Sequence, residues 1–571
     1  MRKSNTVALY TAEGESLSGT PWDCYPRPQL QRSSFYCLNG TWDFAVSNEE
    51  TIPTVYPQTI RVPFTPESLL SGIHRTIDRH CYVFYRRTFA LPDNFVRERV
   101  LLHFGAVDQI ATIFINGCEV GHHVGGYEPF CVDITDVLET ENTVVVRVKD
   151  ELDTHILPYG KQCRKRGGMW YTPVTGIWQT VWVESVPHDY IRSLRIDTSP
   201  ESVQITVDGV STGTVVIDTP HGKITAPLFR GICRVALPKP RQWSPEDPYL
   251  YTFTVTADED TISSYFAMRT LSVQTVNGVK RLCLNGKPYF FHALLDQGYF
   301  SDGLFLPATP KGYEQDILLA KSCGFNTLRK HIKVEPERFY YDCDRLGMVV
   351  FQDMINNGHY SFFRDTALPT IGWKRRNDKR MHRHLLTRQA FLDGMKQTVQ
   401  HLHNHPCVCY WTIFNEGWGQ FDSAAVYQTV SEMDRTRFID TASGWFVGAP
   451  SQVESLHVYF KPVVLPVSEK PIVLSEFGGY SYKPEKHVFN VDKTYGYRFF
   501  KDRSVFQEAL ERLYETEIIP AVKRGLCAAV YTQLSDVEDE TNGLISYDRK
   551  VLKVDTQKML SIAERLQEEL L

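Results

Sequence analysis

Two glutamates stand where a sequence can place a pair of catalytic carboxylates. Glu416 lies in WTIFNEGWGQ (411–420) and Glu476 lies in PIVLSEFGG (471–479), and each ends a short apolar run that follows a proline. Such runs are typical of buried strands, and the C-terminal end of a buried parallel strand is where (β/α) barrels carry their chemistry. Two carboxylates at one barrel mouth are the acid/base and the nucleophile that glycoside cleavage requires. Helix capping or solvent exposure is the alternative for either glutamate alone.

The elements that would position this pair occupy the C-terminal half. Over 276–571, strand-like runs alternate with helical stretches, which predicts a catalytic (β/α)₈ TIM barrel. The eight predicted strands are 289–294, 326–330, 348–353, 407–414, 438–443, 454–459, 471–476 and 528–533.

The preceding residues have a different pattern. Residues 1–185 show short alternating strands separated by turns such as Asn39-Gly40 and Asn116-Gly117, which predicts a sugar-binding β-sandwich of the jelly-roll type. The same pattern continues over 186–275 in a smaller unit, and about 90 residues of short strands fit an immunoglobulin-like β-sandwich.

The composition of the chain limits which binding partners and which cellular location are expected. The chain has 571 residues, a net charge of −5 and no long basic run, which argues against nucleic acid and anionic membranes as partners. No run approaches the roughly 18 apolar residues of a membrane span, and the first apolar stretch is shorter than a signal peptide needs. The 13 cysteines are spread singly, which predicts reduced thiols and a cytoplasmic location.

Several motifs together resemble those of glycoside hydrolase family 2, the group of β-galactosidases, β-glucuronidases and β-mannosidases. The resemblance covers nearly the whole chain and no single motif carries it. The matching segments are YPRP (25–28), LNGTWDF (38–44), GGYEPF (125–130), GGMWYTP (167–173), GIWQTVW (176–182), QWSPEDPYL (242–250), NE (415–416) and SEFG (475–478).

The resemblance implies roles for the strand-end residues. Glu416 would be the general acid/base and Glu476 the nucleophile of a retaining exo-β-glycosidase that hydrolyses terminal sugars by double displacement. Asn415 resembles the residue that bonds the sugar 2-hydroxyl, with a structural amide as its alternative. Tyr459 resembles the tyrosine that donates to the nucleophile, and Arg329 resembles the arginine that supports the nucleophile by charge.

Five further residues are candidates for substrate binding. His331 ends the second predicted strand, where a solvated basic turn is the alternative, and Asp353 ends the third, where a helix cap is the alternative. His457 takes part of the family's His-Asp-Tyr position but also fits a core histidine. Tyr531 ends the eighth predicted strand, where the family often places an aromatic platform, and Trp418 is a candidate for the cleft wall.

Two departures from the family pattern affect the identity of the sugar. ALLDQGY (293–299) replaces the usual polar stretch after the first strand, so Asp296 is expected to contact sugar hydroxyls in another way. The Asn-x-Lys pair that grips a sugar carboxylate would fall near Glu540 and Asn542, and no lysine is there. A neutral sugar, most often a β-galactoside in this family, is therefore predicted; β-glucuronidase or another family 2 specificity is the alternative.

Other classes of function remain open at this stage. A non-catalytic carbohydrate-binding protein and a transglycosidase are the alternatives to hydrolysis. No metal ligand set and no cofactor are predicted, although galactosidases of the family use magnesium or sodium in some cases. The expected partner is an oligosaccharide or glycoside substrate, and a homo-oligomer is possible by resemblance.

Overall fold

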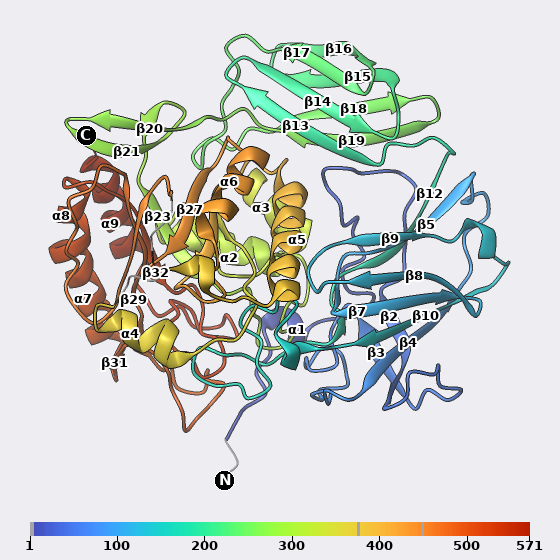
Figure 1. Cartoon of the computed structure of the whole chain (residues 1–571), viewed down its shortest axis with the longest axis horizontal. Helices are drawn as coiled ribbons and strands as arrows, with labels where there is room; N and C mark the ends of the chain where they lie inside the picture. Colours follow the sequence, from blue (N-terminus) through green and yellow to red (C-terminus); the bar gives the residue numbers. More distant parts are fainter. Residues whose placement is uncertain (1–4, 374–376, 447–449, 571) are drawn as a thin grey trace.

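A parallel barrel forms the C-terminal part of the computed structural model, which describes residues 5–373, 377–446 and 450–570 (Figure 1). Its strands pair in the order β27-β26-β25-β24-β23-β32-β29-β28, so β27 and β28 are the two ends of the pairing order. All eight predicted barrel strands are confirmed, with bounds that shift by no more than two residues. They are β23 (Phe291–Asp296), β24 (Thr327–Lys330), β25 (Val349–Asp353), β26 (Val408–Asn415), β27 (Phe438–Ser443), β28 (Glu454–Val458), β29 (Ile472–Gly478) and β32 (Leu526–Thr532).

Helices cover the outside of the barrel, as buried parallel strands require (Figure 1). Local sequence sets several of their ends: Asp502 caps α7 through the N–H groups of Ser504 and Val505, and Gly347 ends α3 with φ +74°. The helices of this layer are α2 (Lys311–Ser322), α3 (Glu337–Leu346), α5 (Leu385–Leu402), α6 (Ser423–Met433), α7 (Arg503–Leu513), α8 (Ile519–Val522) and α9 (Thr556–Glu568), while the short α4 (Leu368–Thr370) lies in the segment after β25.

Two facing antiparallel sheets build the N-terminal jelly roll around one apolar core. Strands such as β10 form this core because every second side chain along them, as in Val144, Val146 and Val148, points into it. The larger sheet contains β3 (Gln58–Val62), β2 (Gly40–Ser47), β4 (Tyr82–Phe89), β10 (Asn142–Lys149), β7 (Ile110–Ile115) and β8 (Cys118–Val124). The smaller contains β1 (Tyr36–Cys37), β12 (Val181–Val186), β5 (Arg99–Phe104) and β9 (Phe130–Asp133).

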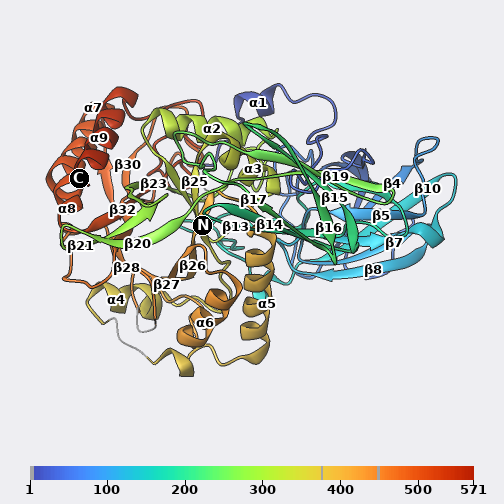
Figure 2. The ribbon, with the colours of Figure 1, turned by 90° about the horizontal axis from the view of Figure 1, so that it is seen from above.

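A seven-stranded antiparallel unit follows and corresponds to the predicted immunoglobulin-like domain. Seen in Figures 1 and 2, it lies across the region where the jelly roll and the barrel meet. Its strands are β13 (Ser193–Ser199), β14 (Ser202–Asp208), β17 (Ile232–Ala236), β16 (Gly222–Phe229), β15 (Thr212–Thr219), β18 (Tyr251–Ala257) and β19 (Asp260–Phe266). A small sheet of β20 (Leu271–Val276), β21 (Val279–Leu284) and β22 (Lys287–Pro288) leads into the barrel.

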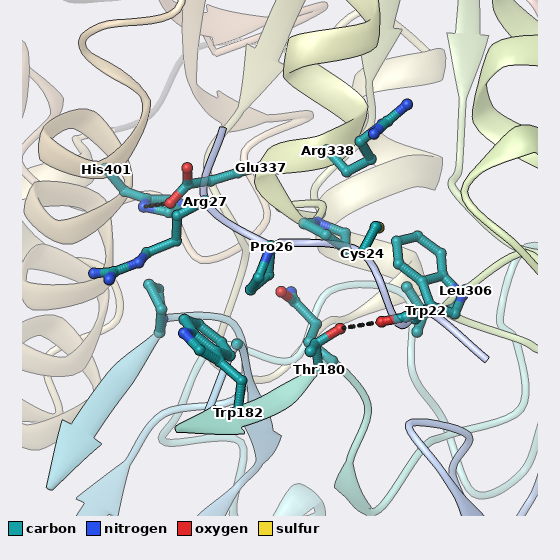
Figure 3. A pocket seen from close by; sticks show the side chains of 14 residues that line it. Trp22, Cys24, Pro26, Arg27, Thr180, Trp182, Leu306, Glu337, Arg338 and His401 are labelled. Carbon is teal, nitrogen blue, oxygen red and sulfur yellow. Dashed lines mark hydrogen bonds and ion pairs between the residues drawn. The ribbon is translucent and has the colours of Figure 1, made fainter. Parts of the chain in front are cut away.

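Buried ion pairs tie the first two units together. Glu184 of β12 accepts from Arg27 at 2.6 Å and from Arg32 at 3.2 Å, and Arg32 also pairs with Asp260 of β19 at 2.9 Å. Arg27 lines a cavity of about 20 Å³ between the jelly roll and the barrel, with Trp182 on one side and Glu337 of α3 on the other (Figure 3). The jelly roll and the immunoglobulin-like unit are thus joined by ion pairs that are largely buried.

None of the helices in the described segments combines the length and the apolar character that crossing a bilayer would demand.

We predict that Arg32→Met destabilises the protein far more than the loss of a surface ion pair. Removing one partner of a buried pair leaves Glu184 and Asp260 with less compensation and costs about 3–5 kcal/mol. Arg86→Met is the control, because its pair with Asp43 is about 40% exposed on both sides and is worth at most about 1 kcal/mol. The midpoint of the first urea unfolding transition measures both, and equal shifts for the two variants would contradict the prediction.

Candidate active site

Glu416 follows the last residue of β26, where the backbone turns sharply out of the strand. Its φ is +53° and that of Gly417 is +73°, and a left-handed conformation at a non-glycine residue is strain that concentrates at functional sites. The Glu416 N–H donates to the carbonyl of Ser443 at 3.0 Å, which holds this turn against the end of β27. Its side chain is 19% exposed. The turn therefore leaves the carboxylate partly open to solvent at the barrel mouth.

Glu476 lies within β29 and is more deeply buried, with 7% of its side chain exposed. Gly478 and Gly479 follow with φ of +82° and +66°. A Cβ atom at Gly478 would lie 2.4 Å from the ring of Tyr531, so only glycine fits there. Gly478 lets the end of β29, two residues beyond Glu476, pass close to Tyr531 of β32.

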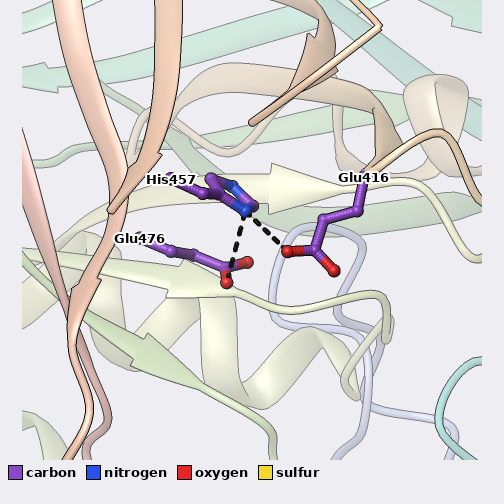
Figure 4. Close-up of side chains that lie close together, drawn as sticks. All are labelled: Glu416, His457 and Glu476. Carbon is purple, nitrogen blue, oxygen red and sulfur yellow. Dashed lines mark hydrogen bonds and ion pairs between the residues drawn. The ribbon is translucent and has the colours of Figure 1, made fainter. Parts of the chain in front are cut away.

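His457 of β28 lies between the two glutamates (Figure 4). Its Nδ1 is 2.9 Å from Oε1 of Glu416 and 3.5 Å from Oε2 of Glu476, while its Nε2 is 2.7 Å from the hydroxyl of Ser443. One carboxylate oxygen of each glutamate and the ring nitrogen lie within 4.8 Å of one another. His457 is therefore more than a core histidine, because its ring contacts both carboxylates.

Arg329, the third residue of β24, joins the polar groups around Glu476 by hydrogen bonds. It donates to Glu476 at 3.1 Å, to the carbonyl of Ser475 at 2.9 Å, to Asn415 Oδ1 at 2.9 Å and twice to Asp353 at 2.9 and 3.0 Å. The five bonds match the five N–H donors of a guanidinium group. Arg329 therefore connects the ends of four barrel strands in one buried network.

The charges around Glu476 keep it ionised. Burial alone would raise the pKa of Glu476, but electrostatic interactions with His457, Arg329 and His331 and the hydrogen bond from Tyr459 outweigh it and lower the pKa to about 2. The Tyr459 hydroxyl donates to Glu476 Oε2 at 2.5 Å. Glu476 is thus ionised and hydrogen-bonded, whereas Glu416 beside it is partly exposed. Such different surroundings are typical of a pair of carboxylates with different chemical roles.

Asp353 and His331 join the same network. His331 Nδ1 is 2.9 Å from Asp353 Oδ2, and both side chains are about 98% buried or more. Burial raises the pKa of Asp353, but Arg329 and His331 reverse this and lower it. The strand-end aspartate thus pairs with a cation, and no helix-capping bond of Asp353 is recorded among the described residues.

Asp296 belongs to a separate group of charges. Its Oδ2 is 2.6 Å from Lys330 Nζ and its Oδ1 accepts from the N–H of Gly298 at 2.8 Å. Lys330 also pairs with Glu335 at 2.8 Å. Both oxygens of Asp296 are thus engaged within the protein, and its predicted contact with sugar hydroxyls stays a prediction.

The structure does not bring Tyr531 into the group around the two glutamates. Its ring is fully buried and packs edge-on against Phe477 at 5.7 Å. The next residue, Thr532, reaches the site instead, with its hydroxyl 3.0 Å from that of Tyr459. Neighbouring residues of a strand face opposite sides, so a shift of one position moves a side chain from the barrel mouth to the outer layer.

Trp418 is 4% exposed and packs in a group of aromatic rings beside Glu416. Its neighbours Trp170 and Tyr360 were not predicted, although Trp170 lies in the GGMWYTP segment. Tyr497, which stacks on Tyr459 at 3.8 Å, was also missed. It lies in an irregular segment with no periodic pattern, so only the folded chain places it there.

A cation is the other occupant that this cluster allows. Glu416, His457 and Glu476 offer three ligand atoms close enough to hold one. A cation bound there would lie beside the Arg329 guanidinium, which is already 3.1 Å from Glu476. Since that charge compensates the carboxylate, the residues fit an ion-paired carboxylate site better than a metal site.

Three models of one family match the chain in order. They are described as glycosyl hydrolases family 2, sugar binding domain, for residues 68–183; glycosyl hydrolases family 2 for residues 188–269; and glycosyl hydrolases family 2, TIM barrel domain, for residues 279–478. Together they cover more than half of the chain, with the same three units as the structure.

Curated relatives are distant and longer than this chain. A β-galactosidase of Thermoanaerobacter pseudethanolicus is 23% identical over 489 residues, which is 79% of this chain and 60% of the relative. The human β-glucuronidase is 25% identical over 389 residues, 61% of this chain and 56% of the relative. The chain thus spans little more than half the length of these curated proteins.

Solved structures with the same fold match almost end to end. A β-D-glucuronidase of Dictyoglomus thermophilum has a TM-score of 0.72 at 18% identity and covers 95% of this chain and 98% of its own. A β-galacturonidase of Eisenbergiella tayi bound to galacturonate has a TM-score of 0.69 at 18% identity, with 95% and 99% covered. These likenesses, the three matched models and the predicted motifs agree, and the chain belongs to glycosyl hydrolase family 2.

Proposed function

We propose that the protein is a retaining exo-β-glycosidase in which Glu476 is the nucleophile and Glu416 the general acid/base. The observation that carries the proposal is the separation of the two carboxylates, whose nearest ligand oxygens lie within 4.8 Å. Retaining enzymes hold their carboxyl groups about 5–5.5 Å apart, whereas inverting enzymes need about 6.5–9.5 Å to admit a water. A separation of this size supports the retaining arrangement over the inverting one.

The division of roles follows from the surroundings of each carboxylate. Glu476 carries its charge at neutral pH and receives hydrogen bonds from Arg329 and Tyr459, so it is ready to attack. Glu416 is the more exposed of the two and is held by His457, which suits a group that exchanges protons with a leaving group and with water.

The reaction then proceeds in two displacements. A Glu476 oxygen forms a bond to the anomeric carbon while the bond to the leaving oxygen breaks and Glu416 gives that oxygen its proton. In the second step Glu416 takes a proton from water, the water oxygen bonds to the anomeric carbon, and the ester to Glu476 breaks. The configuration of the anomeric carbon is the same at the end as at the start.

The neighbouring polar groups would bind the sugar. Because Asn415 Oδ1 accepts from Arg329, its NH₂ group remains to bond the 2-hydroxyl. His331, Asp353 and His457 stay candidates for substrate binding, chiefly by holding the carboxylates in place.

A neutral β-sugar, and a β-galactoside first of all, is the proposed substrate. Glu540 lies where the carboxylate clamp of glucuronidases is expected, is 3% exposed, and accepts hydrogen bonds from the Tyr171 hydroxyl and from Asn542 at 3.1 Å. A sugar carboxylate at this position would lie next to another carboxylate, and a buried charge that is poorly paired costs several kcal/mol. The first curated relative named above is a β-galactosidase, which agrees with this choice.

A β-uronidase is the second candidate, and one residue favours it. Lys161 is a half-buried residue of the jelly-roll loop. Burial raises the pKa of Glu540, and the nearby charge of Lys161 partly offsets this rise. Lys161 is therefore a cation that an anionic sugar could use in place of the missing lysine. Several relatives and structural neighbours carry the names β-glucuronidase or β-galacturonidase.

Hydrolysis with Glu416→Ala tests the acid/base role. We expect kcat/KM to fall about 10²–10⁴-fold on a methyl glycoside, and much less on a dinitrophenyl glycoside, because an activated phenol leaves without a proton. Added azide should restore turnover and give a glycosyl azide of retained configuration. Equal losses on both substrates without azide rescue would assign Glu416 another role.

The pH dependence of kcat/KM tests the state of Glu476. Because its pKa is about 2, Glu476 should lose its charge only when the pH falls well below 4. Tyr459→Phe removes a hydrogen bond that lowers this pKa, so the acid limb should move to higher pH. Tyr531→Phe is the control, because that hydroxyl has no hydrogen-bond partner among the described residues. An unmoved limb in Tyr459→Phe would show that Tyr459 does not set the ionisation.

A panel of nitrophenyl β-glycosides tests the sugar. We expect kcat/KM for the β-galactoside to exceed that for the β-glucuronide and β-galacturonide by about 100-fold or more, as a lost charge pairing implies. Lys161→Met, compared with the exposed Lys165→Met of the same loop, separates the two candidates. A preference for uronides that Lys161→Met abolishes and Lys165→Met keeps would replace the galactoside by the second candidate.

A further inference from the structure

Three aromatic rings from distant parts of the chain meet beside Glu416. Trp418 follows Glu416 by two residues, Tyr360 lies beyond β25, and Trp170 comes from the jelly-roll unit. The ring centroids of Trp170 lie 5.0 Å from Trp418 and 5.1 Å from Tyr360, and those of Tyr360 and Trp418 are 5.9 Å apart. All three contacts are edge-to-face, with interplanar angles of 73°, 66° and 76°, so the rings form a corner and not a stack.

The corner has a covered side and an open side. Trp418 is 4% exposed, and Tyr159 packs against it at 5.6 Å. Trp170 and Tyr360 are only half-buried and leave ring surface accessible. Exposed aromatic surface next to a catalytic carboxylate is the type of surface that lines ligand sites.

The jelly-roll loop that carries Trp170 is firmly attached to the barrel. The N–H groups of Tyr159 and Gly160 both donate to the carbonyl of Asn356, at 3.0 and 3.3 Å. A Cβ atom at Gly160 would lie 2.7 Å from the carbonyl oxygen of Ile332, so the two backbones touch. The Tyr159 hydroxyl donates to the carbonyl of Gly358 at 2.8 Å. The ring of Trp170 is therefore presented by a preorganised segment, which keeps the entropy cost of binding low.

The two open rings have fixed orientations as well. The Tyr360 hydroxyl is 2.5 Å from that of Thr366. Trp170 closes a turn with Gly167, with N–H···O distances of 2.8 and 3.3 Å in the two directions. Tyr360 also lies close to the acid: burial raises its pKa to about 12, and the charge of Glu416 adds to the rise.

The chemistry of the proposed reaction says what must lie there. Glu416 gives its proton to the glycosidic oxygen, so the group attached to that oxygen on the far side from the sugar ring lies next to Glu416. Arg329 and Tyr459 donate hydrogen bonds to Glu476, the carboxylate that attacks the sugar in the proposed reaction. The aromatic corner thus lies on the leaving-group side of the cleavage point.

We propose that Trp170 and Tyr360 bind the leaving group of the substrate, and that this group has a flat apolar face. An aryl ring and the C–H face of a second sugar share this chemistry, and a small alkyl or strongly charged group lacks it. The proposal rests on the proposed glycosidase function and adds to it a specificity-determining residue, Trp170, that the jelly-roll unit supplies to the barrel.

Three substrates with the same sugar and different leaving groups test the proposal. We expect Trp170→Ala to lower kcat/KM about tenfold on the nitrophenyl glycoside and on a β-linked disaccharide, as the loss of one aromatic contact implies. The glycosyl fluoride should change by no more than about twofold, because fluoride makes no contact with the ring. Trp170→Phe keeps an aromatic face and should recover most of the loss on both larger substrates.

A control variant and a folding measurement separate binding from structure. Phe229→Ala removes an aromatic side chain that is 65% exposed on β16, in another unit, and should leave all three rates unchanged. Thermal unfolding of Trp170→Ala checks that the loop still docks. A loss confined to the aryl or to the disaccharide substrate supports the proposal and names the source of the flat face.

Two outcomes would overturn it. A loss of the same size on all three substrates, including the fluoride, would assign Trp170 a purely structural role, and no loss on any would remove it from the site. In both cases the wild type still hydrolyses the substrates and the glycosidase function stands. A wild type that hydrolyses none of the three, fluoride included, would instead refute the glycosidase function, and this inference with it.

Discussion

The buried guanidinium of Arg329 is the constraint on which the active site depends. A buried cation is stable only where every donor finds an acceptor, and the five donors of Arg329 have five recorded acceptor contacts. Those acceptors are Asp353, Asn415, Glu476 and the carbonyl of Ser475, on three different strands around β24. Movement of any of these strand ends would break a hydrogen bond or an ion pair of Arg329, so the network helps to fix the position of Glu476.

The same network separates the two carboxylates chemically. Glu476 receives the positive charge and the hydrogen bond from Tyr459, while Glu416 stands on a strained turn outside that network and touches only His457 of the group. His457 contacts both glutamates and so links them electrostatically. Two identical side chains thereby have different surroundings, since Glu476 is buried and ion-paired while Glu416 is partly exposed.

The barrel mouth is completed by residues from the N-terminal unit. The loop around Tyr159 and Trp170 packs on the strand ends near Ile332 and Trp418, more than 150 residues away in sequence. The buried pairs of Arg27 and Arg32 with Glu184 and Asp260 keep the jelly roll and the immunoglobulin-like unit at a fixed position. The jelly-roll unit thus contributes aromatic side chains that pack beside the turn carrying Glu416.

The sequence alone was enough to predict the architecture and to propose the reacting pair. The eight barrel strands followed from short apolar runs, and Glu416 and Glu476 followed from their positions at the ends of two of those runs, because both signals are local. Arg329, Asn415 and Tyr459 were placed by resemblance, and the structure brings them to the two glutamates.

Only the tertiary structure decided which strand-end side chains face the site. Tyr531 points to the outer layer and Thr532 to the mouth, because adjacent strand residues face opposite ways and the register is set by pairing with β29 and β23. Asp296 forms an ion pair with Lys330, and Trp170 of the jelly-roll unit packs against Trp418 of the barrel. These outcomes depend on contacts between residues far apart in the chain, and no local pattern of residue types encodes such contacts.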